Sequence, residues 1–195
     1  MVQENERLRS LLGMQKDLEL SGVAANVVGY DPSGWVRSLV INQGASSGVS
    51  VGLPVVDSQG VVGQVIAAGR YSGRVLLITD HSSGVDALVQ RTRARGVLEG
   101  SGESLCELSY VERNSDIISG DTIITSGMDG VYPKGLVLGT VSGVRKSSNG
   151  LFLSVEVEPQ VRFAKLENVF VVTSKSVGAD EQPTPRTWSE KTERR

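Results

Sequence analysis

The sequence predicts an all-β protein of two tandem small antiparallel β-barrels, about six strands each, preceded by an N-terminal helix that ends a coiled coil. One β-type segment occurs twice, over residues 36–92 and 104–173, and glycine is high at 23 residues. Both copies run in the order strand, glycine loop, short strand, glycine turn, long strand, turn and strand. Glycines at the corners of short strands are typical of small barrels or sandwiches.

The two copies correspond strand by strand. Residues 36–41 correspond to 106–111, 53–56 to 121–125, 61–66 to 136–141, and 74–79 to 151–157. We therefore expect the following organisation: residues 1–20 as the coiled-coil helix end, 21–93 as the first barrel, 94–173 as the second barrel, and 174–195 as a disordered tail without periodicity or apolar mass.

The first expected element is a helix over residues 4–20, which are rich in Glu, Leu, Arg, Gln and Lys. Leu8, Leu11 and Leu18, together with Gln15, follow the 3-4-3 spacing of a coiled-coil seam. This spacing predicts self-association through the three leucines. The alternative is an amphipathic helix that packs on its own domain, because about two heptads are too few for a stable isolated helix.

The strands follow after Ser21-Gly22, which ends the helix. Residues 23–30 form a predicted strand, and 31–34 a turn. Residues 151–158 alternate apolar and polar side chains, which indicates a half-buried antiparallel strand after the Asn149-Gly150 hairpin signal. The same alternation from residue 106 to residue 110 places Cys106 in the core.

Composition limits the function classes. The net charge of −2 provides no basic field for nucleic acid or an anionic membrane. Cys106 is the only cysteine, so no intrachain disulfide can form, and no apolar run approaches the ~20 residues of a membrane helix. We expect any export signal or membrane anchor to lie outside this chain.

Candidate catalytic chemistry is weak. Gly44-Ala-Ser46-Ser-Gly48 matches the G-x-S-x-G pattern, but strand-like, proline-broken sequence follows it in place of a helix. His81, the only histidine, fits a turn residue after a strand better than a triad member, although two tandem barrels are also the architecture of trypsin-like proteases. One histidine and one cysteine cannot make a zinc site. We expect no catalytic residue, no metal and no cofactor.

Basic residues alternate at Arg91, Arg93 and Arg95, which predicts that all three project from one face. They could bind a phosphate or an acidic partner surface. A solvated strand edge that is protected against aggregation explains them equally.

Several segments resemble the extracytoplasmic region of the MreC family of bacterial rod-shape-determining proteins. They are Asn5-Glu-Arg-Leu-Arg, Leu39-Val-Ile-Asn-Gln-Gly-Ala, Gly48-Val-Ser-Val-Gly-Leu-Pro-Val-Val, Gly60-Val-Val-Gly-Gln-Val, Val75-Leu-Leu-Ile-Thr-Asp, Arg95-Gly-Val-Leu-Glu-Gly and, most specifically, Gly120-Asp-Thr-Ile-Ile-Thr-Ser-Gly-Met-Asp-Gly-Val-Tyr-Pro-Lys-Gly. The resemblance covers residues 5 to 173.

The resemblance implies a non-enzymatic scaffold of the cell-elongation machinery, anchored in the inner membrane, with its two barrels in the periplasm or outside the Gram-positive membrane. It implies binding to penicillin-binding protein 2, MreD and the MreB-linked complex, in support of peptidoglycan synthesis. The competing class is a cell-wall glycan-binding module, since small barrels can hold saccharides.

The contact surface is harder to locate from sequence. Within residues 125–130 the glycines shape a corner, and a partner surface is expected at Met128, Val131 and Tyr132 if their apolar side chains are exposed. The edges of residues 85–91 and 168–173 are further candidates for pairing with another chain.

Overall fold

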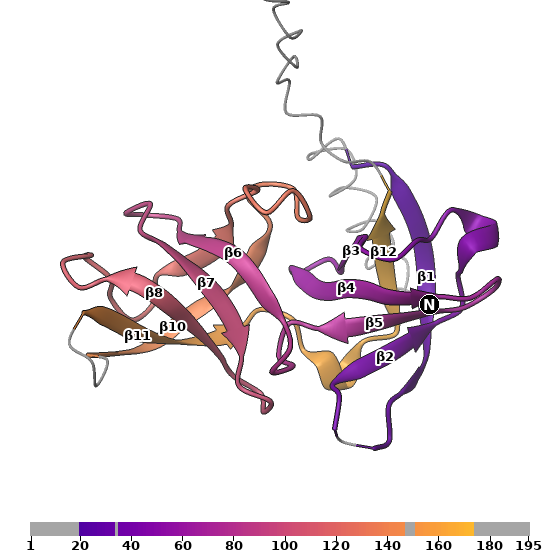
Figure 1. Cartoon of the computed structure of the whole chain (residues 1–195), viewed down its shortest axis with the longest axis horizontal. Helices are drawn as coiled ribbons and strands as arrows, with labels where there is room; N and C mark the ends of the chain where they lie inside the picture. The colour runs from indigo at the N-terminus through magenta and orange to yellow at the C-terminus, as the bar shows by residue number, and fades with distance from the viewer. Residues whose placement is uncertain (1–19, 34, 147–150, 174–195) are drawn as a thin grey trace, which may run out of the picture.

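The computed structural model describes residues 20–33, 35–146 and 151–173. They form two closed six-stranded antiparallel barrels, side by side (Figure 1), which confirms the predicted fold class. The expected helix with its seam residues Leu8, Leu11 and Leu18, the Asn149-Gly150 turn and the tail 174–195 lie outside the described residues.

The first barrel has the strand order β1-β12-β3-β4-β5-β2. Its strands are β1 (Gly22–Tyr30), β2 (Ser38–Ile41), β3 (Pro54–Val56), β4 (Val61–Ala68), β5 (Gly73–Leu77) and β12 (Asn168–Val172). The 3₁₀ turn η1 (Ala45–Ser47) follows β2, and η2 (Phe163–Lys165) precedes β12.

The second barrel has the strand order β10-β11-β8-β7-β6-β9. Its strands are β6 (Gly84–Val89), β7 (Arg95–Gly100), β8 (Cys106–Glu112), β9 (Thr122–Thr125), β10 (Val137–Lys146) and β11 (Phe152–Pro159). Each strand is paired on both sides, so residues 85–91 and 168–173 do not provide the free edges that we expected.

The barrels do not divide at Arg93 as the sequence led us to expect. β6 precedes that position but pairs with β7 and β9 in the second barrel, whereas β12 returns to pair with β1 and β3 in the first. The two sequence units, β1–β6 and β7–β12, therefore exchange their last strands (Figure 1). The strand pairing explains the exchange. The turn after β6 folds this strand back against β7, so β6 does not enter the first barrel. The position between β1 and β3 is filled by β12.

Strand pairing supports the duplication in detail. If each strand of the first unit is matched with the strand six positions later, the neighbour relations β1-β2, β3-β4, β4-β5 and β2-β5 become β7-β8, β9-β10, β10-β11 and β8-β11. All four pairs are present in the second barrel. The same matching turns β1-β12 and β3-β12 into β7-β6 and β9-β6, which is the reciprocal exchange.

Irregularities of register recur at the same places. The β3–β4 pairing shifts between Val61 and Gly63, and the β9–β10 pairing shifts between Val137 and Gly139. Further along, the β4–β5 and β10–β11 pairings shift after Val65 and after Val141. Bulges bend a strand and increase its twist, so both barrels close with the same device.

The barrel junction buries a second layer of side chains. Val55, Val169 and Val171 point into the core of the first barrel. Their sequence neighbours Val56, Phe170 and Val172 belong to the cluster that fills the second barrel, together with Leu20. β3 and β12 are thus buried on both faces, which explains why they read as continuous apolar runs.

Gly63 and Gly139 occupy equivalent positions where two backbones meet closely. A Cβ added at Gly63 would lie 1.8 Å from the carbonyl oxygen of Leu76, and one at Gly139 would lie 2.2 Å from that of Glu158. Because backbone atoms cannot move aside as a side chain can, a methyl group at either position must displace a strand.

We expect Gly63→Ala and Gly139→Ala each to lower the free energy of unfolding by about 1–3 kcal/mol through overpacking. Urea unfolding followed by circular dichroism measures the change. Gly29→Ala on β1 is the matched control, because an added Cβ there meets no atom within 4 Å. An equal loss in all three variants would show that close approach of the opposite backbone is not the cause, since Gly→Ala alone restricts the unfolded chain and should stabilise the strand.

Candidate functional site

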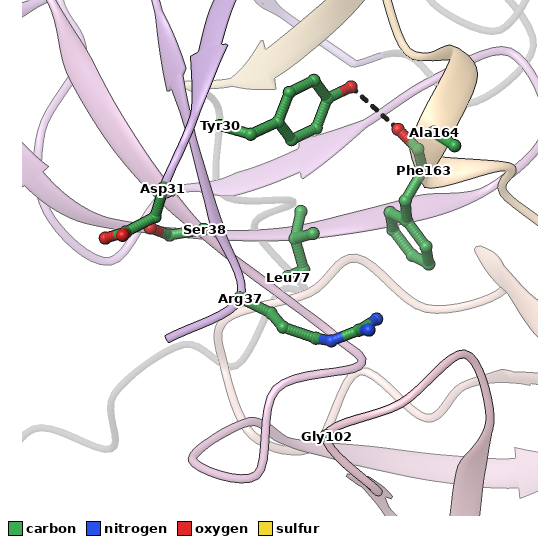
Figure 2. A pocket seen from close by; sticks show the side chains of 8 residues that line it. All are labelled: Tyr30, Asp31, Arg37, Ser38, Leu77, Gly102, Phe163 and Ala164. Atoms are coloured by element: carbon green, nitrogen blue, oxygen red, sulfur yellow. Dashed lines mark hydrogen bonds between the residues drawn. The ribbon is translucent and has the colours of Figure 1, made fainter. Parts of the chain in front are cut away.

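A pocket of about 460 Å³ lies at the barrel junction (Figure 2). The first barrel and the η2 segment supply most of its lining, and the loop after β7 supplies one residue. The lining residues are Tyr30, Asp31, Arg37, Ser38, Leu77, Gly102, Phe163 and Ala164. Leu77 and the ring of Phe163 form apolar walls, while Arg37 crosses the space between them and Gly102 (Figure 2). The pocket lining therefore combines apolar surface with one cation, Arg37, and one carboxylate, Asp31.

Tyr30 fixes the wall of the pocket that η2 forms. Its hydroxyl is 2.8 Å from the carbonyl oxygen of Phe163, to which it donates, and 3.2 Å from that of Leu166 (Figure 2). Burial raises the pKa of this hydroxyl. Because Tyr30 ends β1 and Phe163 lies on the segment between β11 and β12, this contact joins parts of the chain that are far apart in sequence.

Arg37 joins the two barrels. Its amide donates to Asp80 Oδ2 at 2.6 Å, and its guanidinium Nη1 donates to the carbonyl oxygen of Glu103. Burial by itself raises the pKa of Asp80, but hydrogen bonds from the amides of Arg37 and Ser82 outweigh it, so the pKa is lowered. Asp80 is therefore a buried carboxylate that holds the approach to β2 and the turn after β5 together.

Two buried hydroxyls lie unsatisfied in this region of the described structure. Ser38 Oγ and Thr79 Oγ1 have no hydrogen-bond partner among the described residues, and both residues are almost fully buried. Ser38 lines the pocket. Both hydroxyls thus lie where a polar group is costly to bury unless it is hydrogen-bonded.

Ser46 and His81 are not hydrogen-bonded to each other in the described part of the chain. Ser46 lies in η1, and its hydroxyl donates to the carbonyl oxygen of Arg70 at 2.7 Å. His81 lies in the turn between β5 and β6, with its ring against Gly102, and no hydrogen bond in the described part of the chain joins it to a serine. No group of three His, Cys, Asp or Glu residues within the described ranges could hold a metal ion.

Cys106 lies in the core, as predicted, with 1% of its surface exposed. Its Sγ is 3.5 Å from the carbonyl oxygen of Ile78, so the thiol connects β8 to the end of the first barrel. Burial raises the pKa of the thiol to about 12. At physiological pH the group is therefore a protonated, enclosed thiol.

The expected partner surface is exposed at one of its three residues. Met128 is 64% exposed, Val131 packs partly against the core, and Tyr132 is only 5% exposed. The expectation that Tyr132 offers an exposed contact was wrong: Asp129 Oδ1 accepts the amides of both Val131 and Tyr132, and this turn directs the ring inward. Burial also raises the pKa of the Tyr132 hydroxyl.

Arg91, Arg93 and Arg95 do not form one free basic face. Arg91 makes a two-point contact with Asp121, with Nε–Oδ1 and Nη2–Oδ2 distances of 2.8 and 2.9 Å, and a further bond to Asp116. Arg93 lies in the β6–β7 turn with φ 61°, and Arg95 begins β7. Arg91 therefore ties this hairpin to the segment before β9.

Sequence reasoning missed Tyr30, Arg37 and Phe163. Only the return of the chain through η2 brings Phe163 beside Tyr30, and no local pattern signals that approach.

In the part of the chain that the structure describes, no helix is long and apolar enough to span a membrane.

Comparisons with known proteins agree with this architecture. The family model "Rod shape-determining protein MreC, barrel core" matches residues 27–173. The cell shape-determining protein MreC of Haemophilus influenzae is 34% identical over 170 residues, which are 87% of this chain and 48% of that protein. MreC of Escherichia coli is 31% identical over 87% of this chain and 47% of its own length. The chain thus spans about half the length of these relatives.

Solved structures are also similar. One named MreC superposes with a TM-score of 0.81 at 32% identity, covering 88% of this chain and 98% of that chain. A more distant one comes from a complex between Penicillin-Binding Protein (PBP2) and MreC from Helicobacter pylori. Its TM-score is 0.63 at 16% identity, covering 79% of this chain and 98% of that one, which shows a shared fold.

The thiol of Cys106 should be unreactive in the folded chain. We expect a thiol reagent such as dithionitrobenzoate at about pH 8 to label it slowly, because both burial and the raised pKa suppress the thiolate. In denaturant, labelling should be complete within the mixing time. Fast labelling of the native chain would contradict the enclosed position.

The Asp121 carboxylate should make stability depend on acid. The Arg91 hydrogen bonds hold its pKa below the usual value, which is about 3.9 in an unfolded chain. The ionised Asp121 adds to the free energy of unfolding at pH values above its pKa in the unfolded chain. This contribution is lost as the pH falls through the lower pKa of the folded chain, because the unfolded chain takes up the proton first.

We therefore expect Asp121→Asn to be less stable than wild type near neutral pH and to lose less free energy of unfolding between about pH 5 and about pH 2.5. Thermal unfolding across this range measures it. Asp116→Asn, which removes the exposed carboxylate on the same guanidinium, is the control and should keep the wild-type profile. Parallel profiles for wild type and Asp121→Asn would rule the linkage out.

Proposed function

The chain belongs to the MreC family of rod shape-determining proteins, and from this we propose that it is the extracytoplasmic part of a non-enzymatic scaffold that binds peptidoglycan-synthesis enzymes. The observation that carries the proposal is the family match across both barrels, residues 27–173. The unlinked positions of Ser46 and His81 support a binding role over a hydrolytic one.

The first partner that we propose is penicillin-binding protein 2. A fold neighbour of this chain comes from a complex between that enzyme and MreC of Helicobacter pylori. The two barrels are joined by the Arg37 bonds, by the Cys106 contact and by the shared apolar layer, so they can act as one platform. A rigid platform can favour one conformation of a bound enzyme if it binds that conformation more tightly.

The remaining parts of the scaffold are proposed on the resemblance. They are links to MreD and the MreB-associated complex, a membrane anchor outside this chain, and self-association through Leu8, Leu11 and Leu18. One solved relative is described as the major periplasmic domain of the cell shape-determining filament MreC, which supports a location outside the cytoplasm.

The proposal predicts direct binding between this chain and the purified extracytoplasmic part of the transpeptidase, in buffer without metal or cofactor. Biolayer interferometry measures this binding. The same chain, unfolded by heat and recooled, is run alongside to show whether binding requires the native fold.

The chain should also remain unlabelled by a broad serine-hydrolase probe. Absence of binding, or labelling that disappears in Ser46→Ala or His81→Ala, would refute the scaffold reading.

A further inference from the structure

An exposed aromatic pair lies on the outer face of the second barrel. Tyr110 on β8 is 62% exposed and Phe152 on β11 is 42% exposed. Their ring centroids are 6.0 Å apart in an edge-to-face arrangement. Leu151, next to Phe152, is also exposed. These three side chains are apolar but exposed to solvent, so together they form an apolar patch on the barrel surface.

The backbone of Tyr110 is unusual. Its φ of 61° lies in the left-handed region, which an aromatic residue rarely adopts. It sits where the β8–β11 pairing shifts register, between the pairs Leu153–Val111 and Val155–Leu108. A bulge redirects a side chain, and here it turns the ring outward onto Phe152.

Beside the aromatic pair, glutamates face each other across three strands. Glu99 on β7 lies directly opposite Glu107 on β8, and Glu107 lies directly opposite Glu156 on β11. Residues paired in this way project from the same face, and like charges directly opposite destabilise a sheet. Phe152, Ser154 and Glu156 alternate along β11, so the glutamate row and the aromatic pair share one face.

The row is only partly neutralised. The hydroxyls of Ser109, Ser154 and Ser142 donate to Glu99, Glu107 and Glu156 respectively. Arg145, which is 78% exposed, lies 3.5 Å from Glu156 at the end of the row. Glu107, Glu156, Arg145 and Ser154 also line a hollow of about 200 Å³. In Figure 1, β8 and β11 lie on the side of the second barrel away from the first.

We propose that this face, which we call the acidic-aromatic face (Glu99, Glu107, Tyr110, Phe152, Glu156), docks a protein segment that carries lysine or arginine next to an apolar side chain. Charge complementarity selects the occupant. A cation between the glutamates removes their mutual repulsion, and the rings offer it cation–π and apolar contact. The inference rests on the proposed function, since it names the surface by which the scaffold holds a partner.

Two peptide probes test the face directly on the full chain. A Lys-Leu-Arg-Phe-Lys peptide and its acidic match Glu-Leu-Glu-Phe-Glu are titrated with fluorescence anisotropy at low and high salt. We expect the basic peptide alone to bind. The combined variant Glu99→Gln, Glu107→Gln and Glu156→Gln should weaken its binding at least about tenfold and flatten the salt dependence.

Variants of the aromatic pair complete the test. Tyr110→Gly keeps the left-handed backbone but removes the ring, and we expect it to weaken the basic peptide about tenfold. Tyr71→Ala and Glu167→Gln, which change an exposed tyrosine and an exposed glutamate of the first barrel, serve as matched controls and should bind as wild type. The triple glutamine variant should also melt at a higher temperature, which separates lost charge from misfolding.

The outcomes distinguish the two proposals. Equal binding of both peptides, or wild-type affinity in the triple variant, overturns the docking face. A third outcome also overturns the docking face: the chain cosediments with purified peptidoglycan, Tyr110→Gly abolishes this cosedimentation, and the glutamine changes do not. The two rings would then bind a sugar. If the basic peptide binds as expected but the transpeptidase does not, the face stands and the proposed partner fails.

Discussion

The reciprocal exchange of β6 and β12 is the constraint on which the rest of this structure depends. Each barrel is closed by a strand that the other sequence unit supplies, so neither unit has a complete set of hydrogen-bonded neighbours without the other. The first barrel stays open between β1 and β3 until residues 168–172 arrive, which are about 110 residues beyond β3. Such long-range pairing costs loop-closure entropy that the second barrel avoids, because the second barrel is built from the uninterrupted run β6–β11.

The exchange also determines where the barrels meet. Because β12 enters the first barrel next to β3, the outer faces of these two strands turn toward the second barrel and bury Val56, Phe170 and Val172 there. The polar contacts of Arg37, Asp80 and Glu103 then lie around this apolar layer. The pocket between Tyr30, Phe163 and Gly102 is a consequence of the same packing, since all three approach only when η2 leads the chain back from β11 to β12.

Much of this architecture could be predicted from the order of residues. The repeat, the core positions of Cys106 and Leu108, and the glycine corners depend on local spacing, and the structure confirms them. The predicted alternation fails at Tyr110, where a bulge turns the side chain outward. The exchange could not be predicted, because β6 has the same alternation whichever barrel receives it. The inward turn of Tyr132 depends on one side-chain acceptor, Asp129. The row of Glu99, Glu107 and Glu156 depends on register between three strands, which the sequence of each strand alone does not contain.

The pairing of β1 with β12 has a mechanical consequence. Gly22 lies opposite Val172, and the amide of Thr173 donates to the carbonyl oxygen of Ser21 at 2.8 Å, so the chain enters and leaves the barrels side by side. Leu20 is seated in the shared core at this point. A force that separates residues 20 and 173 would break the hydrogen bonds between β1 and β12 one after another, starting at this end of the pair. A load on residue 20 alone would be shared by β12 and by the junction behind it. The described chain therefore enters and leaves at one place, beside the layer of side chains that joins the two barrels, so a force applied there reaches both barrels through the same residues.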